Sequence, residues 1–192
     1  MRWLLTLLLL SCAHARLPAS DDARPGAVVD LSCPPLTPVR LAPLPDSAVE
    51  TIRPTDSVTL TRTACFGVCP VYVVTLHADG RVEAVGERHV REPGPAQWRI
   101  DPALARRVLA EFVTERFVER RASMTAAVTD LPGAQLQLDL GGRVTTVDHV
   151  GAGFELELGV GGPDNAALTR LEALVDVASG ARARFVGCPV ER

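Results

Sequence analysis

Hydrophobic and polar residues alternate over residues 58–62 and again over residues 71–77, where most apolar positions are β-branched. Alternation with a period of two is typical of strands that are buried on one face. Residues 65–70 interrupt this alternation with two cysteines, a glycine and a proline. The pattern therefore predicts a strand, a tight connection and a second strand.

The next strand follows a turn at residues 78–80, and its register depends on the length of that turn. A two-residue turn would pair Leu76 with Glu83, whereas a three-residue loop that ends on a left-handed Gly80 would pair Leu76 with Val82. The second register places apolar side chains opposite each other on one face. We therefore predict the three-residue loop with its β-bulge.

Two later segments have the apolar spacing of amphipathic helices. Asp101 and Pro102 suit the N-cap and the first helical position, and an apolar stripe follows them to about Arg120. The second helix is predicted over about residues 165–178, before Gly180.

A second pair of alternating segments, residues 135–139 and 143–150, surrounds a Gly-Gly turn between the two helices. The order of two strands, joined by a hairpin, and a helix thus occurs twice. A shift of 62 residues maps Gly80 onto Gly142. This order permits a ββα duplication. A plain alternative is that Gly-Arg-Val after a turn is common in a chain rich in these residues.

These elements predict an α+β fold: an antiparallel sheet of about five strands with two helices packed on one face. If both hairpins have the bulged loop, His77 and His149 lie on the uncovered face. Three isolated valines would share that face with polar residues, namely Val73, Val85 and Val147. A mixed surface of this kind commonly binds a protein or a peptide.

The N-terminus has the features of a secretory signal: a positive charge at Arg2, an apolar run over residues 3–10 and small residues after it. The sequence up to Cys12 resembles a bacterial lipobox, in which that cysteine is diacylated and becomes the mature N-terminus. Residues 13–15 offer an alternative A-x-A cleavage site, which would leave an unusually short signal peptide. We therefore expect a signal peptide over residues 1–11 and a lipid anchor that holds the exported domain in the bacterial envelope.

The segment after the signal contains eight of the fifteen prolines of the chain, all between residues 13 and 57. It has no apolar period long enough for a helix. We predict a Pro-rich tether over residues 12–55 and the α+β domain over residues 56–192.

Composition excludes several functions for this chain of 192 residues. Its net charge is −3, and its twenty basic residues are all arginines that are scattered along the chain, so a nucleic-acid surface is not expected. After the leader there is no apolar stretch long enough to span a bilayer. The G-x-S-x-G, H-E-x-x-H and S-x-x-K motifs of hydrolases are absent from the sequence. We expect no catalytic residue and no cofactor.

Four cysteines remain in the exported domain: Cys33, Cys65, Cys69 and Cys188. An even number in an oxidising compartment indicates two disulfides, for which three connectivities are open. The first and last cysteines flank the predicted fold, which favours the pairs Cys33–Cys188 and Cys65–Cys69.

Residues 62–72 and residues 129–132 carry a family resemblance. They are similar to the bacterial family called domain of unknown function 6438, over about residues 58–186. The specific part is Cys-Phe-Gly-x-Cys-Pro-x-Tyr, and the motif residues are Cys65, Phe66, Gly67, Cys69, Pro70, Tyr72 and, in the later segment, Asp130. The resemblance implies a secreted or lipid-anchored α+β domain and no particular activity. The long Gly-rich stretch at residues 151–162 departs from the family pattern.

The Cys65-x-x-x-Cys69-Pro70 spacing also resembles the copper site of cytochrome oxidase assembly proteins, in which two thiolates and a distant histidine bind the metal. Here a predicted strand follows the motif, whereas a helix N-terminus is the common means of lowering a thiol pKa. The context favours a structural disulfide, with Gly67 allowing a positive φ and Phe66 covering the edge of the core. The candidate third ligands would be His77, His89 and His149, while Asp130 suits a turn before Pro132.

We therefore expect a non-catalytic, membrane-tethered envelope domain that binds a protein or a cell-wall component. Its binding surface would be the open sheet face or the loop between Cys65 and Cys69. The alternative is a lipoprotein that uses these two cysteines for thiol redox chemistry or copper handling.

Overall fold

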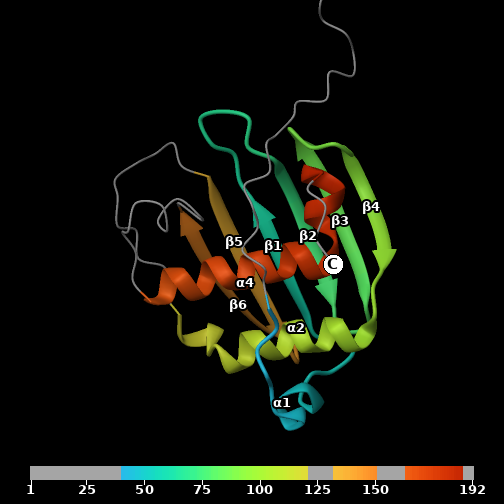
Figure 1. Cartoon of the computed structure of the whole chain (residues 1–192), viewed down its shortest axis with the longest axis vertical. Coiled ribbons are helices and arrows are strands. Elements are labelled where there is room, and N and C mark those ends of the chain that lie inside the picture. The colour runs from blue at the N-terminus through green and yellow to red at the C-terminus, as the bar shows by residue number, and fades with distance from the viewer. Residues whose placement is uncertain (1–39, 121–131, 151–162, 188–192) are drawn as a thin grey trace, which may run out of the picture. The chain divides into compact units, whose positions relative to one another are not determined.

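The computed structural model describes residues 40–120, 132–150 and 163–187 (Figure 1). In chain order, these form the helix α1 (Asp46–Glu50), the strands β1 (Ser57–Arg62), β2 (Val71–His77), β3 (Arg81–Arg88) and β4 (Gly94–Arg99), the helix α2 (Pro102–Thr114), the 3₁₀ turn η1 (Phe117–Glu119), the strands β5 (Gly133–Leu140) and β6 (Arg143–Val150), the helix α4 (Pro163–Ser179) and the π-helical turn η2 (Arg182–Val186). Of the helices in these ranges, none is both long and apolar enough to cross a membrane.

The six strands form one antiparallel sheet in the order β4-β3-β2-β1-β5-β6, and α2 and α4 both cross the same face of it (Figure 1). The predicted α+β class is confirmed, and the sheet has one strand more than the five expected. The additional strand is β4, whose glycine and proline made it look like a loop. Pro95 is tolerated there because β4 is an edge strand, which leaves half of its backbone groups without a partner strand.

The core lies between the sheet and these two helices. Its fully buried side chains come from alternate strand positions and from one side of each helix, and they include Val58, Leu60, Leu76, Leu136, Val108, Phe112, Leu168 and Leu171. The first of the two helices begins as predicted, because the Asp101 carboxylate accepts a hydrogen bond from the Ala103 N–H at 2.9 Å. It ends at Thr114, earlier than predicted, where Arg116 takes a left-handed conformation with a φ of 54°.

The β2–β3 hairpin has the predicted register, with Leu76 opposite Val82. Its loop ends on Gly80, which has a φ of 84°. A Cβ at this position would lie 2.5 Å from the Ile100 carbonyl oxygen. Both the backbone conformation and the close approach therefore require glycine.

The β5–β6 hairpin does not have the predicted bulged loop. Gly141 and Gly142 have φ values of 61° and 85° and form a two-residue turn. A change of register by one residue moves every side chain of a strand to the other face. Val147 and His149 therefore face the helices and are buried, whereas Val144 faces outward and is 51% exposed. The prediction that His149 and Val147 lie on the open face is wrong, and the 62-residue correspondence with the first hairpin is lost after the turn.

Residues 40–55 were predicted as tether, yet they pack against the domain. Ile52 is buried, and Leu41, Leu44 and Val49 lie against the core. The Ala42 N–H donates to the buried Glu111 carboxylate at 2.5 Å, and Arg170 donates to the same carboxylate at 2.8 Å. The folded domain therefore includes the chain from Arg40 onward. Three prolines interrupt this segment, so its apolar residues follow no regular period along the chain.

Several predictions concern parts of the chain outside the described residues. These are the signal peptide, the lipid anchor on Cys12, the Cys33–Cys188 disulfide, the Asp130 turn and the Gly-rich segment at residues 151–162. They stay predictions.

Candidate functional site

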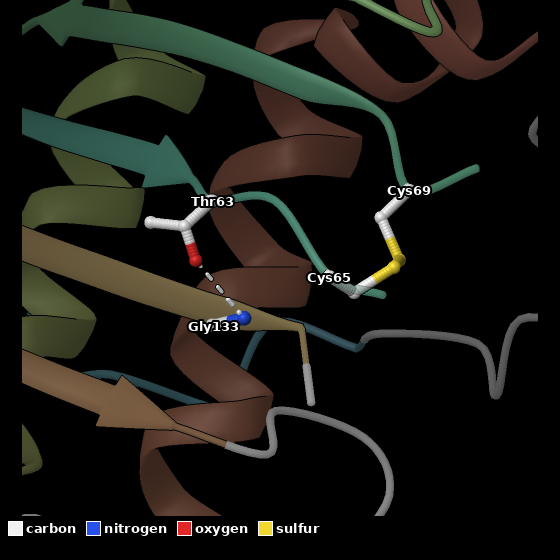
Figure 2. Close-up of a disulfide and its surroundings, with 4 residues drawn as sticks. All are labelled: Thr63, Cys65, Cys69 and Gly133. Atoms are coloured by element: carbon white, nitrogen blue, oxygen red, sulfur yellow. Dashed lines mark hydrogen bonds between the residues drawn. A yellow bond between two sulfur atoms is a disulfide. The ribbon is translucent and has the colours of Figure 1, made fainter. Parts of the chain in front are cut away.

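The connection between β1 and β2 is a loop closed by a disulfide between Cys65 and Cys69, whose Cα atoms are 5.7 Å apart (Figure 2). This disulfide was predicted and is confirmed. Gly67 has a positive φ of 157°, and its N–H donates to the Cys65 carbonyl at 2.9 Å. The bridge and this short turn close the loop on itself.

The tip of this loop carries two exposed apolar side chains. Phe66 is 87% exposed and Val68 is 49% exposed. The prediction that Phe66 covers the edge of the core is therefore wrong. We use the name Cys loop for residues 63–70, a segment that contains no charged residue.

The N-terminal end of the Cys loop is fastened to β5. The Thr63 N–H donates to the Gly133 carbonyl at 3.0 Å, and the Thr63 hydroxyl accepts from the Gly133 N–H at 3.1 Å (Figure 2). A Cβ on Gly133 would lie 2.7 Å from that hydroxyl oxygen, so a larger residue here would displace the Thr63 side chain from its hydrogen bond.

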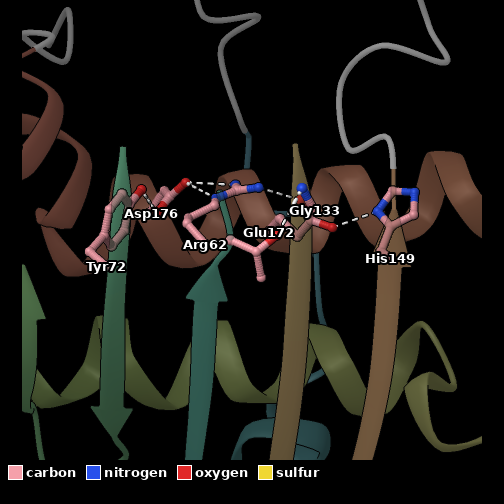
Figure 3. Close-up of polar contacts among 7 residues, drawn as sticks. Arg62, Tyr72, Gly133, His149, Glu172 and Asp176 are labelled. Atoms are coloured by element: carbon pink, nitrogen blue, oxygen red, sulfur yellow. Dashed lines mark hydrogen bonds and ion pairs between the residues drawn. The ribbon is translucent and has the colours of Figure 1, made fainter. Parts of the chain in front are cut away.

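Where the two strands meet the loop, Arg62 of β1 lies opposite Tyr72 of β2 in the sheet register. The Arg62 guanidinium pairs with the Glu172 carboxylate at 2.6 Å and with the Asp176 carboxylate at 2.7 Å. The Tyr72 hydroxyl donates to the other oxygen of Asp176 at 2.6 Å. Both ends of the Cys loop are thus fastened to α4 by buried polar contacts (Figure 3).

His149 of β6 joins the same cluster, with its Nδ1 2.6 Å from the second oxygen of Glu172 (Figure 3). Glu172 and Asp176 are four residues apart, so both carboxylates project from one side of α4. We call these five side chains, Arg62, Tyr72, His149, Glu172 and Asp176, the stem network. The sequence analysis missed both acidic residues, although each directly follows a buried apolar residue of α4.

Contact between opposite charges explains how the stem network tolerates burial. Burial by itself would lower the pKa of Arg62, but the carboxylates of Asp176 and Glu172 hold that pKa well above its usual value. The pKa of Tyr72 is also raised, first by burial and then by the negative charge of Asp176. Arg62 is therefore a permanent cation in this site, and Tyr72 is a neutral hydrogen-bond donor.

The raised pKa of Tyr72 predicts a loss of stability at alkaline pH. The unfolded chain releases the phenolic proton near its ordinary pKa of about 10, before the folded chain does, so the contribution is complete below about pH 10 and is lost above it. Tyr72 is the single tyrosine of the chain, so tyrosinate absorbance at alkaline pH reports this residue alone. We expect this absorbance to rise together with unfolding, as followed by circular dichroism. Ionisation near pH 10 in a chain that stays folded would contradict the burial of Tyr72.

The structure separates the histidines that were candidate third ligands for copper. His77 lies on the open face and contacts Glu83 at 3.0 Å, His89 is exposed in the β3–β4 turn, and His149 contacts Glu172. Across residues 40–120, 132–150 and 163–187 there is no group of three or more His, Cys, Asp and Glu side chains arranged to hold a metal ion. The two sulfur atoms of the Cys loop are bonded to each other.

The open face of the sheet is the other candidate surface. Val73 and Val85 lie opposite each other on it, as predicted. Together with Thr75, Glu83, Pro95 and Gln97 they line a shallow depression of about 440 Å³. The carboxylate of Glu83 is already paired with Arg81 and His77.

Comparisons with known proteins agree with the family resemblance. Residues 56–160, more than half of the chain, match the family described as Domain of unknown function (DUF6438). This range includes the Cys loop with Arg62 and Tyr72, while Glu172 and Asp176 lie beyond its end. A comparison with curated proteins found no match. The chain belongs to the DUF6438 family.

Proposed function

We propose that this protein is a non-catalytic domain of the bacterial cell envelope, held at a membrane by a lipid on Cys12, that binds another envelope component through its Cys loop. The observation that carries this proposal is the exposure of Phe66. A large apolar side chain stands in water at the tip of a loop that is closed by a disulfide and fastened below by buried contacts.

Exposure of one apolar side chain is common in folded proteins. What favours binding here is that Phe66 stands on a rigid, disulfide-closed loop. Burial of a phenylalanine side chain contributes about 1.5–3 kcal/mol. A loop that is already ordered loses little conformational entropy when it binds, so more of that free energy remains for the complex. Aromatic side chains are enriched at interfaces.

The open sheet face supports binding less well than the Cys loop. Its polar side chains already form hydrogen bonds with one another. Examples are the Thr59–Thr75 bond at 2.9 Å and the Gln135–Asp148 bond at 2.7 Å. Its depression is shallow, and its apolar residues are interspersed with Thr75, Glu83 and Gln97. The alternative function, redox or copper chemistry at Cys65 and Cys69, has less support because a strand follows the loop.

Site-specific photo-crosslinking tests the proposal. A photoreactive phenylalanine analogue is placed at residue 66 of the full-length, lipid-modified chain in intact cells. Val113 of α2, which is 39% exposed, provides the matched control position. We expect a discrete crosslinked product from position 66 and none from position 113, because only the Cys loop contacts the partner. Equal labelling at both positions would contradict binding through the loop.

A further inference from the structure

We propose that the envelope component contacted by the Cys loop is the lipid bilayer itself, which Phe66 and Val68 enter at the boundary between headgroups and acyl chains. This inference rests on the proposed function and names its binding partner. The loop would then be a second, reversible membrane contact in addition to the lipid on Cys12.

The chemistry of the loop suits a bilayer. The Cys loop has no charged side chain to dehydrate, and Arg62, the nearest basic residue before it, keeps its charge inside the stem network. The hydroxyl of Thr63 already accepts a hydrogen bond from Gly133. Arg88 lies opposite Val71 in the register and is exposed at this end of the sheet, so a basic side chain is available there for lipid phosphates.

The expected strength of the contact favours a membrane over a separate protein. Burial of two side chains of this size supports an affinity of only about millimolar strength. A stable protein complex buries about 800 Å² on each partner, far more than two side chains at a loop tip provide. A weak contact is sufficient for a chain that is already attached to the bilayer, because the attachment raises the effective concentration.

The position of the anchor allows this contact. The described domain begins at Arg40, and the chain between Cys12 and Arg40 can span at most about 100 Å when extended. The loop therefore lies within reach of the surface that holds the anchor. The disulfide and the stem network keep the two apolar side chains at the tip, so no ordering of the loop is needed on insertion.

Quenching of tryptophan fluorescence by brominated lipids tests this inference. The full-length, lipid-modified chain with Phe66→Trp is reconstituted into phosphatidylcholine vesicles with or without brominated acyl chains. A chain with Val113→Trp is the matched control, and the native Trp98 is common to both. Because a side chain at the boundary enters the bilayer by about 5–10 Å, we expect at least about a twofold loss of emission for residue 66 and little loss for residue 113.

Absence of quenching at residue 66, or equal quenching at both residues, would overturn the inference. The crosslinking experiment separates this failure from that of the proposed function. If residue 66 crosslinks to a protein in cells and is not quenched in vesicles, the loop binds a protein and the membrane contact is wrong. If the chain purified from cells carries no lipid on Cys12 and is not recovered with the vesicles, the lipid anchor, and with it the proposed function, is wrong.

Discussion

Replacement of Arg62 with methionine is expected to lower the free energy of unfolding by about 3–5 kcal/mol, the usual cost of removing one partner from a buried ion pair. Methionine preserves most of the side-chain volume but leaves two buried carboxylates, Glu172 and Asp176, without their cation. Chemical denaturation followed by circular dichroism measures the change. Arg143→Met is the matched control, because Arg143 is exposed on β6, and its expected effect is within about 0.5 kcal/mol.

The same network predicts how the loss can be reversed. If the unpaired carboxylates cause the destabilisation, then Glu172→Gln and Asp176→Asn in the Arg62→Met background should recover part of the lost stability, because neutral amides cost less to bury than ions. If the stability losses of the three substitutions simply add, these side chains do not act together. A loss in Arg62→Met no larger than in Arg143→Met would contradict the assignment of Arg62 as the cation of the site.

Replacement of Phe185 with alanine is expected to cost about 3–5 kcal/mol, whereas Phe66→Ala should change the free energy of unfolding by no more than about 0.5 kcal/mol. Phe185 is fully buried in η2, where its ring stacks on Tyr72 at 5.0 Å and contacts Trp98 at 6.5 Å between centroids. Phe66 is exposed and leaves no cavity when it is removed. Denaturation curves of the two variants, measured under the same conditions, give the comparison.

The contrast between these two phenylalanines bears directly on function. A side chain that contributes nothing to folding and yet exposes apolar surface is available for binding. If Phe66→Ala were as destabilising as Phe185→Ala, the tip of the Cys loop would be part of the core. Phe66 would then not be available for a contact outside the domain.

Local sequence predicted the elements that depend on neighbouring residues. The N-cap at Asp101 and the first hairpin register follow from a few adjacent side chains and from the glycine at residue 80. The same local reasoning failed at the second hairpin, because two consecutive glycines allow the shorter turn. One residue of difference there reversed the faces of His149 and Val147. Strand β4 was missed because its edge position, which tolerates proline, is a property of the whole sheet.

Sequence alone was enough to predict the α+β class, the family and the disulfide-closed loop, because periodicity and a distinctive motif are local properties of the chain. The folded structure was needed to show that Phe66 is exposed and that the loop is fastened through the stem network. Arg62 and Tyr72 lie more than 100 residues before Asp176, with which both form hydrogen bonds. Contacts over such separations arise when α4 packs across the sheet, and no spacing along the chain encodes which side chains then meet.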